Sequence, residues 1–243
     1  MSAEVDLNQF VTGGYFITKP VARPDFLSIS PGPVMPERFI SLSHCFADFL
    51  PGPWVWEDWK RQIDRGKEVG KWGIDSGRTT EVIEWVRSRY VSGEMGWLYV
   101  FCTLDTPRDF LRHFNVPLDD LVLVGIGLHR RDVSRFMEAR PNREFAPYGG
   151  YLLISKGLEL APGGTLRGFE PLVTGGGGSF HSWLCNSLHE VAFAKKGIRP
   201  NTDGFLDRLE DARWVTDHVN EGPDERGEPG LWLPWLVVTY PIK

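Results

Sequence analysis

The chain has 243 residues, of which 42% are hydrophobic and 24% charged, and its formal net charge is −5. This acidic balance disfavours a nucleic-acid interface spread over the whole domain, because such surfaces are normally basic. Three cysteines without a CxxC pair, Cys45, Cys102 and Cys185, argue against a disulfide framework or a cysteine-rich zinc site.

The N-terminal residues lack the basic start and apolar run of a signal peptide. The longest apolar stretch, Leu231–Val238, is interrupted by Pro234 and is too short to span a bilayer. We therefore expect a cytoplasmic protein that does not enter a membrane. The sequence leaves its oligomeric state open.

Short runs rich in β-branched and aromatic residues predict the strands. In chain order they are Gly14–Thr18, Arg38–Ser43, Trp97–Thr103, Leu121–Leu128, Tyr151–Ile154 and Leu231–Tyr240. The run Leu121–Leu128 is apolar throughout, which is typical of a strand buried on both faces.

Apolar residues spaced at a period of 3.6 predict the helices between these runs. They cover Thr79–Tyr90, Asp132–Ala139, Ser179–Lys195 and Asp203–Val219, the third capped by Ser179 after the glycine run 175–178. Strands and helices mix without strict βαβ alternation, so we predict an α+β fold. It would have a mixed or antiparallel sheet, several packed helices, and one compact domain over residues 1–243 with exposed loops near 20–36 and 221–230.

The segment SFHSWLCNSLHE places His181, Cys185 and His189 four residues apart, so on a helix they would line one side. Imidazoles and a thiolate are good zinc ligands. However, eight residues of helix span about 12 Å, which is too far for both ends to bind one ion. A helix face with a buried cysteine explains the row as well, and we predict no metal and no cofactor.

An enzymatic alternative uses Cys185 as a nucleophile, with His181 or His189 as its base and with or without a metal. Such an enzyme would be a hydrolase or a transferase. Cys185 would lie well inside the predicted helix, where the helix dipole has faded and no longer favours a thiolate. We therefore commit no residue to catalysis.

Two further segments could bind an anion. The glycines at 175–178 precede a predicted helix, but no Gly-Lys-Ser/Thr follows, so we favour a flexible turn over an anion site. The segment Gly125–Asp132 carries His129, Arg130 and Arg131 at a predicted strand end. A solvated basic helix start accounts for this second segment.

The segment PGPWVWEDWKRQ surrounds Glu57 and Asp58 with Trp54, Trp56 and Trp59. Tryptophan is enriched at binding hot spots, and acidic groups attract a basic partner. We predict a partner-binding surface at Trp54, Trp56, Glu57 and Asp58, although these rings would also suit the core.

In acidic character, stand-alone length and lack of catalytic motifs, with GYFITKP near its start, the chain resembles immunity proteins of bacterial polymorphic toxin systems. The resemblance implies a cytoplasmic protein that binds and neutralises a cognate toxin. The expected function is therefore a non-enzymatic protein-binding module whose partner is a protein, such as a toxin domain, and not a nucleic acid.

Overall fold

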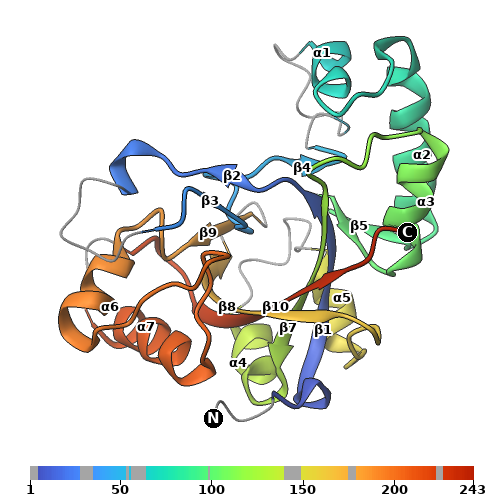
Figure 1. Ribbon diagram of the computed structural model, residues 1–243. Helices are drawn as coiled ribbons and strands as arrows, with labels where there is room; N and C mark the ends of the chain where they lie inside the picture. The colour runs from blue at the N-terminus through green and yellow to red at the C-terminus, as the bar shows by residue number, and fades with distance from the viewer. Residues whose placement is uncertain are drawn as a thin grey trace.

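A curled antiparallel sheet organises the fold (Figure 1). The computed structural model describes residues 5–27, 35–52, 55, 64–97, 99–139, 149–174, 179–222 and 227–243. Within these residues the eight-stranded sheet has the order β5-β6-β1-β7-β10-β8-β9, and β4 also pairs with β1. Its strands are β1 (Phe10–Thr18), β4 (Phe49–Leu50), β5 (Met95–Gly96), β6 (Val100–Phe101), β7 (Val122–His129), β8 (Thr165–Thr174), β9 (Phe180–Ser182) and β10 (Trp232–Tyr240). A separate ribbon joins β2 (Val21–Ala22) to β3 (Arg38–Phe39).

The central strands β1, β7 and β10 are buried on both faces, and every residue of β1 and β10 is buried. Successive side chains of a strand point to opposite faces. The sheet therefore contributes side chains to two apolar cores, one on each face. Leu236 and Val238 of β10 lie in one core, and Trp235 and Val237 lie in the other. Apolar burial on both faces is why these strands read as continuous hydrophobic runs.

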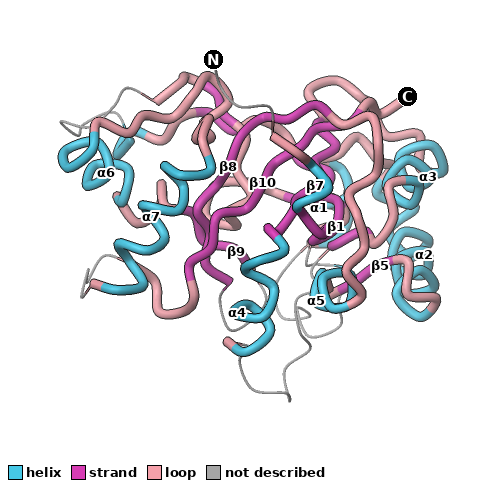
Figure 2. Tube along the Cα trace, turned by 90° about the horizontal axis from the view of Figure 1, so that it is seen from below, coloured by secondary structure: helices cyan, strands magenta, loops and turns pink. Residues whose placement is uncertain are grey.

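Helices cover both faces of the sheet. They are α1 (Arg65–Gly70), α2 (Thr79–Val91), α3 (Asp105–His113), α4 (Val133–Glu138), α5 (Gly150–Ser155), α6 (Leu188–Lys196) and α7 (Leu209–Glu221). Helices α2, α3, α6 and α7 contribute to the core that contains Leu236, whereas α4 and α5 contribute Phe136 and Tyr151 to the core that contains Trp235. Figure 2 shows α6 and α7 beside one end of the sheet and α2 and α3 beside the other. The predicted α+β fold, with an antiparallel sheet and packed helices in one compact domain, is confirmed.

Several predicted elements agree with the structure. Helix α2 matches Thr79–Tyr90, α4 matches Asp132–Ala139, and β7 and β10 match their predicted strands within a residue or two. Helix α7 begins at Leu209, later than predicted. None of the helices in the described part of the chain has the length and apolar run that crossing a bilayer requires.

Two predicted elements are wrong. The run Tyr151–Ile154 lies in helix α5, where Tyr151, Leu153 and Ile154 are buried and Leu152 is exposed. A short apolar run fits a buried helix as well as a strand, and the tertiary packing here selects the helix. The predicted helix Ser179–Lys195 is instead strand β9, a turn, and helix α6 from Leu188.

The described parts of the predicted loops are mostly exposed or half-buried. Within 20–36, however, Leu27 and Met35 are buried in the core, and β2 and the 3-10 turn Asp25–Leu27 give that segment local structure.

Candidate functional site

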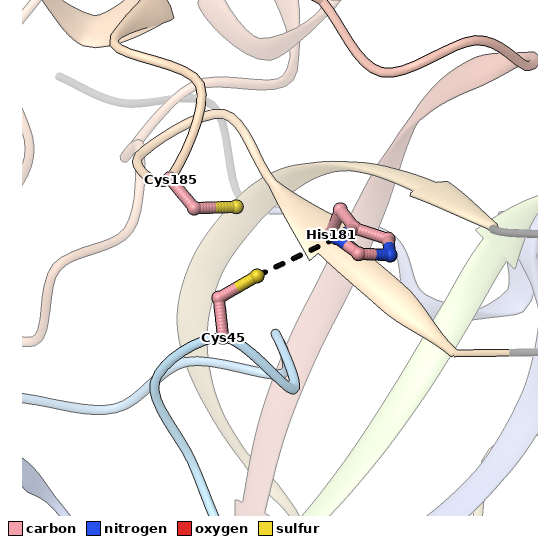
Figure 3. Close-up of side chains that lie close together, drawn as sticks. All are labelled: Cys45, His181 and Cys185. Atoms are coloured by element: carbon pink, nitrogen blue, oxygen red, sulfur yellow. Dashed lines mark hydrogen bonds between the residues drawn. The ribbon is translucent and has the colours of Figure 1, made fainter.

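Cys45, His181 and Cys185 come together from two distant segments of the chain (Figure 3). The two sulfurs and a ring nitrogen of His181 all lie within 4.8 Å of one another. Within the cluster, Cys45 Sγ lies 3.4 Å from His181 Nδ1. Cys45 is exposed, while His181 and Cys185 are partly buried, so the cluster lies at the protein surface.

Strand β9 presents His181. The strand pairs with β8 at the edge of the sheet, with Val173 opposite His181. Its neighbours Phe180 and Ser182 are fully buried, whereas the His181 side chain is 23% exposed. Because strand side chains alternate between faces, burying Phe180 and Ser182 turns His181 outward.

The turn that carries Cys45 is attached to β9 by His44. The backbone N–H of His44 donates to the Phe180 carbonyl at 3.1 Å, and the Phe180 N–H donates to His44 Nδ1 at 3.1 Å. Burial lowers the pKa of His44 to about 4, so the ring is neutral at physiological pH. These two hydrogen bonds place Cys45 beside His181.

Cys185 belongs to the turn that follows β9. Its backbone N–H donates to the Ser182 carbonyl at 3.1 Å, and its sulfur accepts the Ser182 N–H at 3.2 Å. The thiol donates to the Ser182 carbonyl at 2.9 Å. Burial raises the pKa of Cys185 to about 12, and the adjacent Cys45 also raises it. In this environment the thiol stays protonated at neutral pH.

A buried carboxyl, Glu170 of β8, fixes the segment that leads into the Cys45 turn. It accepts the Leu42 N–H at 3.0 Å and lies 2.8 Å from Ser41 Oγ. Ser41 Oγ in turn accepts the Ser43 N–H at 3.1 Å. Burial raises the pKa of Glu170 to about 7. Glu170 therefore joins residues 41–43 to the sheet, and these residues position Cys45.

Glu228 approaches the cluster from the chain that enters β10. Its Oε1 lies 3.6 Å from His181 Nδ1, and its side chain is 45% exposed. The Trp232 indole N–H donates to the Glu228 carbonyl at 3.1 Å, which holds the backbone in place. A carboxylate is therefore available beside the imidazole, on the edge of the cluster.

His189, the third member of the predicted row, lies elsewhere. It is only 1% exposed in α6, and burial lowers its pKa. The helical row does not form because Ser187 adopts a left-handed conformation, with φ of 55°, immediately before α6 begins. Cys185 and His189 are thus on separate local structures, and the predicted Cys185–His189 pairing has no support in the described contacts.

The remaining predicted sites divide into two groups. Trp54, Trp56, Glu57, Asp58 and the glycines at 175–178 lie outside the described residues. Arg130 is partnered, because it donates to the Asn8 carbonyl at 2.9 Å and pairs with Glu159 at 3.5 Å. Its role in holding the N-terminal segment agrees with a structural interpretation of Gly125–Asp132.

Sequence reasoning missed Cys45 and Glu228. Cys45 lies 136 residues from His181 in the chain, and no spacing rule connects the two. The residues around Cys45 form no recognised motif, so the sequence near it carries no signal of a site.

Two thiols, an imidazole and a carboxylate can act in three ways: as metal ligands, as a dithiol that oxidises to a disulfide, or as a nucleophile with a base. Cys185 is unsuited to the last role because its thiol is protonated and hydrogen-bonded to a carbonyl. Comparison with protein-family models, curated proteins and solved structures finds no match to this chain, so its assignment rests on the geometry of the site.

Proposed function

We propose that this chain is a non-enzymatic protein-binding module, and specifically an immunity protein that binds and neutralises a cognate toxin. Its net charge of −5 favours a basic partner, since complementary charge speeds encounter. The observation that argues against the Cys185 enzyme is the hydrogen bond from its thiol to the Ser182 carbonyl at 2.9 Å.

The enzymatic alternative needs Cys185 as a thiolate with His181 or His189 as its base. With a pKa of about 12, the thiolate is a very small fraction of Cys185 at neutral pH. His189 is buried in α6, and Cys185 donates its proton to the Ser182 carbonyl instead of to an imidazole. The nucleophile that this alternative requires is therefore not activated.

Phe26 and the half-buried Phe46 form an aromatic pair that offers a second candidate contact surface. Phe26 is 50% exposed and stacks on Phe46, with ring centroids 6.0 Å apart. Phe46 also lines a small hollow of about 130 Å³ together with Trp72 and Lys19. The segment that holds Trp54, Trp56, Glu57 and Asp58 lies between β4 and α1, shortly after Phe46 in the chain.

The test begins with the partner. The full chain, carrying a cleavable tag, is cross-linked and purified from its native host, and the partner is identified and produced separately. If the partner is a toxin, coexpression with this chain should restore growth. Failure to recover a partner, together with a Cys185-dependent turnover of a substrate, would overturn the proposal.

Binding kinetics then test the surface. Charge reversal at Glu57 and Asp58 should slow association and reduce its dependence on salt. Truncation of Trp54, Trp56 or Phe26 to alanine should speed dissociation, by about 30-fold for a hot spot worth about 2 kcal/mol. Leu152→Ala is the matched control, because Leu152 is 63% exposed on α5. Unchanged rate constants in folded variants would place the interface elsewhere.

A further inference from the structure

We propose that Cys45, His181 and Cys185 bind a zinc ion, with Glu228 as the fourth ligand. Thiolates and imidazole are the ligands that zinc prefers in structural sites, which are closed and four-coordinate. This inference goes beyond the protein-binding proposal, uses Cys185 as a metal ligand and not as a nucleophile, and concerns how the turn at Cys45, strand β9 and the start of β10 are held together.

The spacing of the ligand atoms fits a tetrahedral ion. Bond lengths of about 2.3 Å to sulfur and about 2.0 Å to nitrogen place a sulfur and a nitrogen about 3.5 Å apart in a tetrahedral site. Cys45 Sγ and His181 Nδ1 are 3.4 Å apart. Two sulfurs on one zinc lie about 3.8 Å apart, inside the 4.8 Å that encloses this cluster. Small side-chain rotations therefore suffice to bring these three atoms into the first coordination shell.

Glu228 supplies the carboxylate. In a tetrahedral zinc site a nitrogen and an oxygen lie about 3.4 Å apart. Glu228 Oε1 is 3.6 Å from His181 Nδ1, its side chain is 45% exposed, and a rotation toward the sulfurs would complete the coordination. Two thiolates and one carboxylate would add three negative charges around a divalent ion, which favours retention of the metal.

Two N–H groups lie near the Cys185 sulfur and could donate to a metal-bound thiolate. Its sulfur accepts the Ser182 N–H at 3.2 Å and lies 3.5 Å from Asn186 Nδ2. Hydrogen bonds donated to a ligand atom by neighbouring groups orient and stabilise metal ligands. A bound cation deprotonates a coordinating thiol outright, so the proton that Cys185 shares with the Ser182 carbonyl would be released.

The site is largely built before an ion arrives. The hydrogen bonds between His44 and Phe180 join the Cys45 turn to β9, and Ser182 holds Cys185 in its turn. The prediction of no metal rested on the poor geometry of the helical row and on the lack of other Cys/His pairs in the sequence, and that row does not form. In the folded protein Cys45, and not His189, lies beside His181 and Cys185. The helical span of about 12 Å therefore no longer separates the candidate ligands.

Metal content and cobalt spectroscopy test the proposal. Untagged protein, purified in reductant without chelator, should contain one zinc per chain by elemental analysis. After zinc is removed under reducing conditions, titration with Co²⁺ should produce thiolate-to-cobalt charge-transfer absorption and the visible bands of a tetrahedral site. About two protons should be released per ion bound, one from each cysteine.

Matched variants assign the ligands. Cys45→Ser and Cys185→Ser should each remove the high-affinity site, whereas Cys102→Ser, at the third cysteine, should retain it. Cys45 is exposed, so its substitution leaves the core intact and separates loss of metal from loss of fold. Glu228→Gln should weaken binding by about tenfold, or about 1.4 kcal/mol. Glu84→Gln removes the same charge from an exposed position on α2 and should change nothing.

Three results would overturn the zinc proposal. Absence of cobalt charge transfer in the reduced wild-type chain would overturn the proposal. So would equal metal affinity in the wild type and the folded Cys45→Ser variant. A Cys45–Cys185 disulfide in the isolated protein, with no zinc bound after its reduction, would show that the pair is a dithiol and not a metal site.

Discussion

Replacing Glu170 by glutamine tests whether a neutral carboxyl supports the segment behind Cys45. Glu170 is 1% exposed, accepts the Leu42 N–H at 3.0 Å, and lies 2.8 Å from Ser41 Oγ. Glutamine has nearly the same shape, retains a carbonyl oxygen for the Leu42 N–H, and does not ionise. The variant therefore removes the titration while preserving the packing.

The raised pKa of Glu170 makes the folded protein less stable as the pH rises. Burial raises the folded-state pKa of Glu170 from 4.5 to about 7. The folded protein therefore holds this proton more tightly than the unfolded chain does. The stabilisation from the neutral carboxyl is complete below about pH 4.5 and is lost as the pH rises through about 7. At about 1.4 kcal/mol per pKa unit, the full loss is about 3 kcal/mol.

Urea unfolding of the wild type and Glu170→Gln, in reductant and chelator, measures this difference directly. Between about pH 5 and about pH 8, the free energy of unfolding of the wild type should fall relative to that of the variant by up to about 3 kcal/mol. Glu84→Gln, at an exposed position on α2, should run parallel to the wild type. Parallel curves for Glu170→Gln as well would refute the assignment of a buried, protonated carboxyl.

Three other substitutions test the packing. Leu188→Asp places a charge at a site that is 1% exposed in the core, and should cost about 4 kcal/mol or more; a melting temperature unchanged within error would reject this face of α6. Gly96→Ala would drive a methyl group into the Cα of Gly149 on a facing segment, so it should lower the melting temperature sharply unless β5 and α5 are farther apart. Arg213→Met leaves Asp132 buried without its ion-pair partner at 3.0 Å and should cost about 3 kcal/mol in urea unfolding, most of it recovered when Asp132→Asn is added.

Local pattern by itself was enough to predict the elements whose own residues carry the signal. Helix α2 repeats its buried residues Val82, Ile83 and Val86 at helical spacing, and β7 is apolar along its length. Both signals depend on periodicity within one segment, which the sequence contains in full. The α+β class follows from the same signals, because it needs only the order and type of the elements.

Local sequence pattern did not predict strand β8. Its sequence TLRGFEPLVT includes glycine, glutamate and proline, all of which are disfavoured in strands. In the sheet, Pro171 lies opposite Pro234 of β10, and Glu170 finds its partners on the segment at Ser41 and Leu42. Contacts with distant segments outweigh the low strand preference of these residues. Those contacts cannot be predicted from the residues of β8 alone.

The candidate site was also predicted only in part from the sequence. The sequence drew attention to His181 and Cys185 but placed them on a helix with His189, because apolar spacing continued through residues 179–195. Only the pairing of β9 with β8 turns His181 outward, and only the hydrogen bonds between His44 and Phe180 bring Cys45 to it. Sequence patterns report what one segment does alone; the meeting of side chains 136 residues apart depends on how the sheet closes and which turn packs on its edge.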